Sequence, residues 1–236
     1  MKLMENQQQA QRIQTSVLNG IERKALVWMA QRMPGWVTSD MLTIVGVIGA
    51  ALIGTGYALS AVDYRWLWLS TFGLFVNWFG DSLDGTLARV RNTQRPVYGY
   101  YIDHTLDCVN ELMMFVGAGL SCYVNLGFAM VAFALYLMLT INVSINAHLK
   151  SEFKLTYAKM GPTEFRLLMV IANTLLIFIP SFRALEFELS LLGKDVTLHA
   201  LDFACLLIIL VLAVIYTCTI ISDTRKYARI DPPKQR

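Results

Sequence analysis

Charged residues are scarce in this sequence of 236 residues. Asp, Glu, Lys and Arg make up 16% of it, whereas soluble domains carry about 25%. Hydrophobic residues make up 56%, and the mean hydropathy is +0.49. This composition excludes a soluble enzyme, a disordered chain and a collagen-like chain, and it indicates a protein whose solvent is lipid. A net charge of +3 is small for a protein that binds nucleic acid, so we expect no nucleic-acid partner.

The sequence also lacks close cysteine pairs and an apolar N-terminal segment. Its four cysteines, Cys108, Cys122, Cys205 and Cys218, lie in or beside apolar runs, without the spacing of zinc or redox sites. We interpret them as small buried hydrophobic residues. The first residues, MKLMENQQQAQRIQ, are polar and do not resemble a secretory signal peptide, so we expect no cleavage.

Long apolar runs organise the rest of the chain. A helix needs about 20 mostly apolar residues to cross a membrane, and six segments qualify, which predicts an all-α integral membrane protein. Residues 112–149 contain no charged residue and are nearly twice too long for one crossing, so we expect a turn at 125–127. The six predicted spans are 41–62, 66–90, 102–124, 128–149, 167–182 and 203–222.

Basic residues are distributed unevenly around these spans. Seventeen of the 20 Lys and Arg residues lie in segments on the same side as the two termini. The other side has only Arg65, Arg183 and Lys194. Because cytoplasmic loops carry the excess of basic residues, we predict that both termini are cytoplasmic.

The segment before the first span has a mixed character. Residues 17–33 combine Leu, Val, Trp and Met with Arg and Lys at helical spacing, which predicts an amphipathic helix. This helix either lies on the inner leaflet or caps the cytoplasmic face in solvent. We therefore divide the chain into a cytoplasmic or interfacial segment (1–37), a six-helix transmembrane domain (38–228) and a cytoplasmic tail (229–236).

Four aspartates interrupt the second and third spans. Asp81 and Asp84 are three residues apart, and Asp103 and Asp107 are four apart, so each pair shares one helix face. Each Asp at the centre of a membrane costs about 3 kcal/mol, so something cationic must offset about 10 kcal/mol. Oxygen ligands without Cys or His favour Mg²⁺, Mn²⁺ or Ca²⁺. Glu111 lies one turn deeper than this set.

Small residues follow the first aspartate pair on nearly the same face. Gly85 and Ala88 leave room beside the carboxylates for a flat or extended ligand, and Arg89 lies at the cytoplasmic end. The alternative is close helix packing, for which membrane helices widely use small residues. His104 lies between two of the aspartates but points to another face, so we expect it to pack or to support a ligand.

The string DSLDGTLAR at 81–89, followed by GYYIDHTLD at 99–107, resembles the signature of the CDP-alcohol phosphotransferase family. That signature is D-x2-D-G-x2-A-R, a spacer and G-x3-D-x3-D, and all eight fixed positions are present here. The layout of six spans extends the resemblance over most of the chain. At Thr38-Ser39-Asp40 the sequence departs from the Thr-Pro-Asn that the family often shows.

The resemblance implies an enzyme of phospholipid biosynthesis that moves a phosphoalcohol from a CDP-linked donor to an acceptor hydroxyl and releases CMP. A short chain with six spans favours CDP-diacylglycerol as the donor, and a choline or ethanolamine phosphotransferase that acts on a lipid alcohol is the alternative. Asp107 is implied to be the general base, beside two Mg²⁺ or Mn²⁺ ions. The implied metal ligands are Asp81, Asp84, Asp103 and Asp107, and the residues implied to contact CMP are Gly85, Ala88, Arg89 and Gly99.

The acceptor is expected near the start of the fifth span. Gly161-Pro162 breaks the chain before Thr163, which predicts that Thr163 caps this helix. Glu164 and Arg166 are then predicted to lie at the edge of the pocket that contains Asp107, with its mouth on the cytoplasmic side. An Arg at this depth in the membrane costs free energy unless it faces a polar cavity.

Two other interpretations of the acids remain. A cation-coupled transporter also carries carboxylates within the membrane, but it does not explain the glycines at family spacing. An inactive family member is disfavoured because no acid of the motif is missing. Membrane lipids are the expected partners, and the resemblance is consistent with a homodimer.

Overall fold

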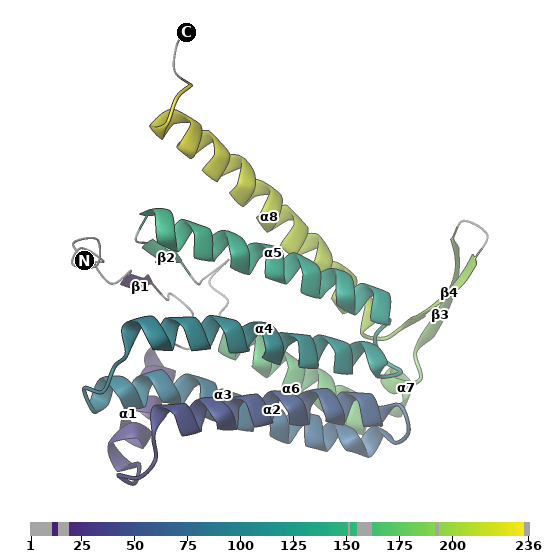
Figure 1. Ribbon diagram of the computed structural model, residues 1–236. Coiled ribbons are helices and arrows are strands. Elements are labelled where there is room, and N and C mark those ends of the chain that lie inside the picture. Colours follow the sequence, from purple (N-terminus) through teal and green to yellow (C-terminus); the bar gives the residue numbers. More distant parts are fainter. Residues whose placement is uncertain (1–10, 14–18, 151, 155–161, 192–193, 234–236) are drawn as a thin grey trace.

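The computed structural model describes residues 11–13, 19–150, 152–154, 162–191 and 194–233. Helices dominate it, and each of the six predicted spans falls on a long helix (Figure 1). A short 3₁₀ turn, η1 (Tyr64–Trp66), leads into α3. The helices are α1 (Asn19–Arg32), α2 (Ser39–Ser60), α3 (Leu67–Val90), α4 (Pro96–Leu120), α5 (Leu126–Lys150), α6 (Pro162–Phe178), α7 (Pro180–Arg183) and α8 (Asp202–Ile230).

Three of these helices are long and apolar enough to cross a membrane by composition alone. They are α2, the Leu126–Asn146 part of α5, and α8. Helices α3 and α4 carry the acids of the motif, and α6 has 17 residues, which at 1.5 Å per residue is slightly short for a 30 Å hydrocarbon core. The helices support an integral membrane protein, whereas the full set of six crossings stays a prediction.

Helix ends that successive membrane crossings would place on the same side lie at the same end of the bundle. Figure 1 shows α1, the α3–α4 connection and β2 (Glu152–Lys154) at one end of the bundle. It shows α7 and the β3–β4 hairpin at the other end, and α8 beside α5, tilted away from the remaining helices. The connections that we predict to be cytoplasmic therefore share one end.

Glycines bring α2, α3 and α4 into close contact. A Cβ on Gly80 of α3 would lie 2.2 Å from the backbone nitrogen of Gly46 in α2. A Cβ on Gly117 of α4 would lie 2.3 Å from the backbone oxygen of Gly54, also in α2. No larger side chain fits at either contact without moving the backbones apart. As a result, α2 fixes the spacing of the two helices that carry the acids.

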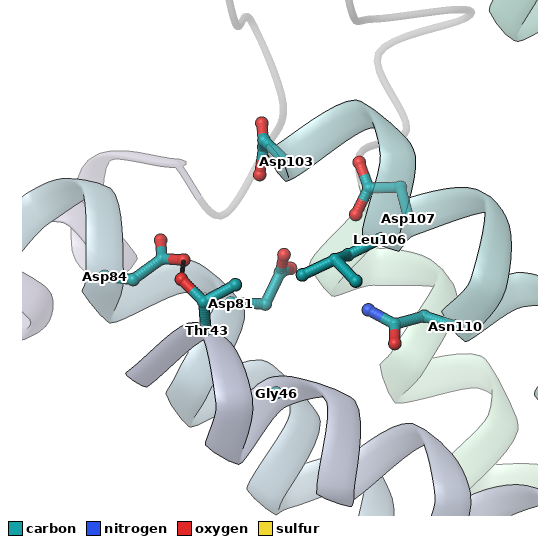
Figure 2. Close-up of a pocket in the computed structure, with 8 residues that line it drawn as sticks. All are labelled: Thr43, Gly46, Asp81, Asp84, Asp103, Leu106, Asp107 and Asn110. Carbon is teal, nitrogen blue, oxygen red and sulfur yellow. Dashed lines mark hydrogen bonds between the residues drawn. The ribbon is translucent and has the colours of Figure 1, made fainter. Parts of the chain in front are cut away.

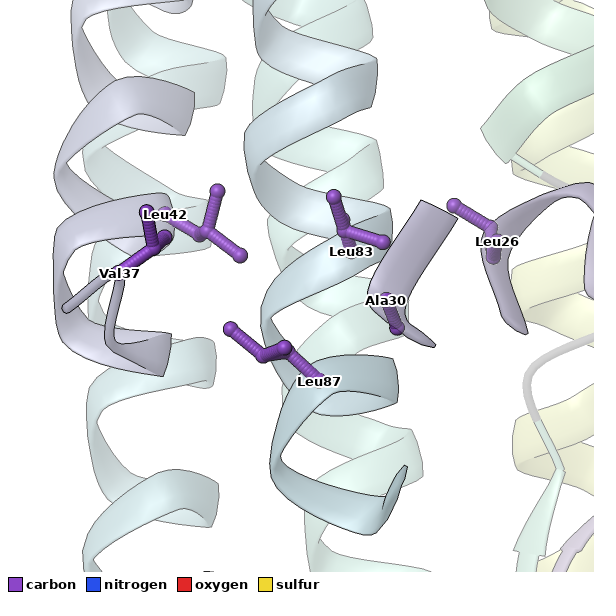
Figure 3. Packing of buried hydrophobic residues seen from close by; sticks show 6 residues of the cluster. All are labelled: Leu26, Ala30, Val37, Leu42, Leu83 and Leu87. Atoms are coloured by element: carbon purple, nitrogen blue, oxygen red, sulfur yellow. The ribbon is translucent and has the colours of Figure 1, made fainter. Parts of the chain in front are cut away.

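Helix α1 packs on α3 near the acidic end of the bundle. The buried cluster at this contact consists of Leu26, Ala30, Val37, Leu42, Leu83 and Leu87 (Figure 3). Ile21 and Trp28 are exposed on another face of α1, where they lie about two turns apart. The predicted helix at 17–33 thus exists from residue 19 to 32, and residues 17 and 18 lie outside the described residues. Its contact with lipid stays a prediction.

The turn between the third and fourth predicted spans comes slightly earlier than expected. Helix α4 ends at Leu120, and α5 begins at Leu126, where Asn125 Oδ1 accepts a 2.9 Å hydrogen bond from the Gly127 amide. Asp202, fully buried at the start of α8, accepts a 2.6 Å hydrogen bond from the Asn125 amide and one of 2.8 Å from the His199 amide. This carboxylate ties the turn to the start of α8.

The all-α prediction is wrong at two places. An antiparallel hairpin of β3 (Glu186–Leu191) and β4 (Lys194–His199) precedes α8, with Glu186 opposite His199. The alternation of polar and apolar residues in EFELSL is the period of a strand. At the other end, β1 (Gln11–Ile13) pairs in parallel with β2.

Two predicted helix ends also differ. Helix α6 stops at Phe178, four residues early, because Pro180 has no amide hydrogen with which to continue it. Helix α8 runs on to Ile230, through the charged stretch that we took for the start of the tail. The predicted domain boundary at residue 228 therefore falls within a helix.

The four cysteines are free, and only part of their predicted burial holds. Cys205 is buried and Cys108 is half-buried, whereas Cys122 and Cys218 lie on the surface of the protein. The interpretation as buried residues is wrong for the latter two. Cys122 follows the end of α4, and Cys218 lies on α8, the least buried of the three helices of membrane length.

Candidate active site

Three of the four motif aspartates meet between α3 and α4. Asp81, Asp103 and Asp107 each place one carboxylate oxygen within 4.8 Å of the other two. Asp84 lines the same pocket without joining this triad (Figure 2). The remaining lining residues are Thr43, Gly46, Leu106 and Asn110. The space that they enclose is large enough for about one ion or water molecule.

Asp84 is held by the first turn of α2. The hydroxyl of Thr43 donates a 2.7 Å hydrogen bond to Asp84 Oδ2, and the Gly85 amide donates to Asp84 Oδ1. The hydroxyl of Ser39 donates a 2.9 Å hydrogen bond to the backbone oxygen of Asp84. Sequence reasoning missed Ser39 and Thr43 as parts of the site. Their spacing of four residues puts both hydroxyls on the face of α2 that carries Gly46, but it does not indicate that this face meets Asp84.

Arg166 reaches the acids from α6. Its Nη2 lies 2.6 Å from Asp81 Oδ2, and its Nε donates a 3.0 Å hydrogen bond to Asn77 Oδ1. The side chains of Arg166 and Asp81 are only 16% and 27% exposed, so this ion pair is partly shielded from solvent. The Asn77 amide nitrogen in turn donates to the backbone oxygen of Gly46. Arg166 thus contacts an acid of the triad, deeper than the pocket edge at which we predicted it.

The start of α6 differs from the predicted cap. The helix begins at Pro162, so Thr163 already lies inside it, and Gly161 is outside the described residues. The Thr163 hydroxyl donates a 2.7 Å hydrogen bond to Glu22 Oε1 of α1. Glu164 lies in the first turn of α6, as expected from the sequence.

The residues expected to contact CMP lie at the same end of the bundle. Gly85 and Arg89 are adjacent on α3, because a Cβ on Gly85 would lie 3.4 Å from Arg89 Nη1. Arg89 also donates a 2.9 Å hydrogen bond to the Thr86 hydroxyl. Ala88 is half-buried, and Gly99, near the start of α4, is exposed with open space around it. These positions leave the polar end of α3 open to a ligand.

The α3–α4 connection is fastened to the chain that enters α2. Arg91 donates hydrogen bonds to the backbone oxygens of Val37, Met33 and Pro34, at 2.9 Å and 2.8 Å for the last two. Asn92 adopts a φ of 54°, a conformation that Asn tolerates better than most residues.

Two further contacts complete this end of the bundle. Arg95 forms an ion pair with Asp40, so the Asp of the Thr-Ser-Asp departure binds the α3–α4 connection. His104 stacks on Tyr100, with ring centres 4.1 Å apart, and its Nδ1 lies 4.0 Å from Asp103 Oδ2. This position agrees with the packing role that we expected for His104.

The donor set fits a hard divalent cation. The triad supplies three carboxylates, and neither a His nitrogen nor a Cys sulfur belongs to the same group of potential ligands in the described residues. Oxygen-only sets of this kind suit Mg²⁺, Mn²⁺ or Ca²⁺. Arg166 offsets part of the negative charge, and the remainder favours a cation between α3 and α4.

Comparison with known families places most of the chain in one of them. Residues 34–221 match the family described as CDP-alcohol phosphatidyltransferase. This range contains α2 to α7, most of α8, and every residue that lines the acidic pocket.

Two kinds of curated relatives are similar to parts of the chain. Phosphatidylinositol phosphate synthase of Cutibacterium acnes is 37% identical over 86 residues, which make up 36% of this chain and 38% of that protein. Cholinephosphotransferase 1 of Danio rerio is 31% identical over 101 residues, 40% of this chain and 26% of that protein. Cholinephosphotransferase 1 of Gallus gallus is 22% identical over 182 residues, 73% of this chain and 53% of that protein. The matched part therefore spans little more than half of these relatives at most.

Proposed function

The chain belongs to the CDP-alcohol phosphatidyltransferase family, and we propose that it transfers a phosphoalcohol from a CDP-linked donor to the hydroxyl of an acceptor. The oxygen of the acceptor forms a bond to the phosphorus of the phosphoalcohol, and the bond from that phosphorus to CMP breaks, so that CMP leaves. The observation that carries this proposal is the triad of Asp81, Asp103 and Asp107, which lies on the family motif at the end of a membrane bundle.

The motif acids have divided roles in this proposal. Asp81, Asp84 and Asp103 would hold two divalent ions, Mg²⁺ or Mn²⁺, with Asp107 beside them; the space that these residues enclose in this structure fits about one ion, so the second would need the carboxylates to move apart. Such ions, when bound, polarise the pyrophosphate and stabilise the leaving CMP. Thr43 keeps one oxygen of Asp84 turned toward α2, so the orientation of this ligand is set before any ion arrives.

Asp107 is the general base of the proposed reaction. It lies one turn beyond Asp103 along α4, and Glu111 is the acid of that helix that lies deeper. Of the motif acids, Asp107 is therefore the one that an acceptor entering from the lipid side would meet first. Its carboxylate takes the proton of the attacking hydroxyl, and a positioned base of this kind contributes about 10²- to 10⁴-fold in rate.

The donor and acceptor sites use the residues around these acids. Gly85, Ala88 and Gly99 would allow the CMP moiety close to the backbone, with Arg89 beside it. Arg166 and Glu164 would contact a polar acceptor. A guanidinium has five N–H donors, and the contacts of Arg166 with Asp81 and Asn77 use two of them, so it retains donors for a ligand.

We take CDP-diacylglycerol as the donor, with CDP-choline or CDP-ethanolamine as the alternative. One relative is named for making phosphatidylinositol phosphate, and this fits transfer of a phosphatidyl group to a phosphorylated acceptor. The cholinephosphotransferase relatives fit the alternative, in which the acceptor is a lipid alcohol. Both reactions occur in a membrane, with both termini and the pocket mouth on the cytoplasmic side and a homodimer as the proposed assembly.

A substrate matrix tests the proposal. The purified protein is incubated with Mg²⁺ or Mn²⁺, each of the three CDP-linked donors, and inositol 1-phosphate, glycerol 3-phosphate or diacylglycerol as acceptor. CMP release and the mass of the lipid product are measured. We expect one donor and acceptor pair to give both. If no pair releases CMP, the proposed reaction is wrong, and metal-coupled transport becomes the interpretation of the acids to test.

A further inference from the structure

Asn110 is a buried polar residue in the acidic pocket that is not part of the family motif. It lies on α4 three residues after Asp107, so the two side chains share one helix face. It lines the pocket together with Asp81, Asp103 and Asp107 (Figure 2). Only 8% of the residue is exposed.

The side-chain oxygen of Asn110 is not satisfied by the protein. Its Oδ1 is buried and has no hydrogen-bond partner among the described residues. Buried side-chain oxygens usually have such partners, and polar residues inside membrane helices are often functional. In Figure 2 the amide nitrogen points toward Leu106 and Asp81, and the oxygen points away from them. The side chain therefore offers its donor atoms to the pocket.

The position of Asn110 relative to Asp107 is fixed by the backbone. A Cβ on Gly54 of α2 would lie 2.4 Å from the backbone oxygen of Met113, which follows Asn110 by one turn of α4. Helices α2 and α4 are therefore in direct contact at this point, and α4 cannot move toward α2. Asn110 is held beside the general base by the helix itself.

The pocket has many acceptors of hydrogen bonds and few donors. Its four carboxylates accept when they are ionised, and the hydroxyl of Thr43 is already donated to Asp84. An alcohol has one hydrogen to give and two lone pairs to receive with. Asp107 can take the hydrogen, but an oriented alcohol also needs a donor to its oxygen. Arg166 donates to Asp81 from beside the pocket. Among the described side chains that line the pocket itself, Asn110 is the one that carries N–H groups.

We propose that Asn110 binds the acceptor, with its amide N–H donating to the oxygen of the acceptor hydroxyl. This inference depends on the proposed function, since it concerns the alcohol that attacks the CDP-linked donor. Two contacts, from Asn110 to the oxygen and from the hydroxyl to Asp107, fix the direction of the attacking lone pair. Water competes with the acceptor for this site. The acceptor has the advantage, because other parts of the pocket also hold it while Asn110 orients its hydroxyl.

The test is the partition of the donor between the alcohol and water. Hydrolysis of the donor and transfer to the acceptor both release CMP, but only transfer gives the product in which the acceptor is joined to the phosphoryl group of the donor. The ratio of product to CMP does not depend on how much protein is folded. The wild type and Asn110→Leu are compared with CDP-diacylglycerol and inositol 1-phosphate, or with CDP-choline and diacylglycerol, whichever pair the wild type uses. Leu has a similar size and removes an unsatisfied amide, so the variant is expected to fold.

For Asn110→Leu we expect the KM for the acceptor to rise about tenfold and the ratio of transfer to hydrolysis to fall about tenfold, the loss typical of one hydrogen bond in a binding site. The dissociation constant of the CDP-linked donor should stay within about twofold. Asn173→Ala is the matched control: this buried Asn of α6 bonds Tyr57 and Thr71, outside the acidic pocket. It should lower the melting temperature and leave the ratio unchanged.

The outcomes separate the two proposals. If the wild type releases no CMP with either pair, the proposed function is overturned and this inference with it. If the wild type is active and Asn110→Leu keeps the wild-type ratio and acceptor KM, the inference alone is overturned. A fall in the ratio in both Asn110→Leu and Asn173→Ala also overturns it, because the effect would then come from the general packing of the bundle.

Discussion

At the scale of single residues, Asp81 takes part in two sets of contacts. It belongs to the acid triad, and it forms the ion pair with Arg166. Replacement of Asp81 by Asn removes a charged ligand, and an uncompensated Arg166 would repel a cation. We predict that Asp81→Asn lowers Mg²⁺-dependent turnover by at least about a hundredfold, since loss of a charged ligand costs several kcal/mol. CMP release over a range of Mg²⁺ concentrations measures it.

The control for Asp81 is Asp63→Asn. Asp63 accepts a hydrogen bond from the Arg65 amide at the start of η1, at the opposite end of α3. This variant should keep wild-type turnover. Full activity of the wild type in excess chelator would contradict the metal role of the whole cluster.

The proposed base differs from the proposed ligands in what its removal should change. We predict that Asp107→Asn lowers the rate of transfer about 10²- to 10⁴-fold, the usual contribution of a general base, and leaves donor affinity within about twofold of the wild type. Single-turnover kinetics measure the rate, and titration with the CDP-linked donor measures the affinity. If Asp107→Asn loses donor affinity as severely as Asp81→Asn, Asp107 is mainly a metal ligand.

Arg166 has contacts that allow two roles, in acceptor binding and in pairing with Asp81. We predict that Arg166→Ala raises the KM for a polar or phosphorylated acceptor about tenfold or more, in line with the loss of a charge-assisted hydrogen bond. The KM for the donor should rise less. Steady-state kinetics with each substrate varied in turn measure both values, with Arg166→Lys as the variant that keeps the charge. Equal changes in the two KM values would show that Arg166 acts only through Asp81.

Much of the site could be predicted from the sequence because its residues follow each other at helical spacing. The motif acids lie on two consecutive helices, so spacing alone indicated which of them share a face. Thr43, Asn77 and Asn110 could not be predicted in the same way. Their roles come from contacts between helices, such as the hydrogen bond from Thr43 to Asp84, 41 residues later in the chain.

At the scale of elements, Glu22 joins α1 to the bundle beside the apolar face of this helix. Glu22 Oε1 accepts hydrogen bonds from the Trp78 indole of α3 at 2.8 Å and from the Thr163 hydroxyl of α6 at 2.7 Å. Arg166 lies on α6 one turn after Thr163. The contact therefore links α1 to the helix that carries Arg166.

We predict that Glu22→Ala destabilises the protein by about 1 to 3 kcal/mol, because two partly buried donors lose their acceptor. In a chain of this length the melting temperature should fall by about 2 to 4 °C per kcal/mol. Thermal unfolding in detergent measures it. Glu22→Gln keeps an oxygen at the same position, so its melting temperature should fall less. Arg23 lies on the exposed face of α1, so Arg23→Ala should change the melting temperature little. Equal stability of Glu22→Ala and the wild type would contradict the prediction.

All six long helices were predictable, and most of their ends lie within four residues of the predicted ones, because apolar runs of membrane length have few other solutions. The errors have local causes. The proline at position 180 ended α6 early, and the strand period of EFELSL was obscured by its position between two apolar runs. Helix α8 continued through the charged segment, where polar side chains meet α5: Asn146 donates a 2.7 Å hydrogen bond to Asp223 and accepts one of 2.7 Å from the Tyr227 hydroxyl.

At the scale of the whole molecule, the distribution of basic residues and the arrangement of helix ends point to the same orientation. The three basic residues that we assign to the outer side belong to η1, α7 and β4, which lie at or near the end opposite to α1. The motif acids lie in the halves of α3 and α4 next to the α3–α4 connection, which Figure 1 shows at the α1 end. A cytoplasmic α1 would therefore place the pocket where a water-soluble CDP group can reach it.

Cysteine labelling in intact cells tests this orientation. Cys122 is exposed in the α4–α5 turn, which we predict to lie outside, and Thr93 is exposed in the α3–α4 connection, which we predict to lie inside. In a chain with Cys122 as its single cysteine, a membrane-impermeant maleimide should label intact cells. A chain that has Thr93→Cys and lacks the four native cysteines should react only after permeabilisation. The reverse pattern would show that the bundle is inverted, because the two connections lie at opposite ends of α4 and a helix that crosses the membrane must place them on opposite sides.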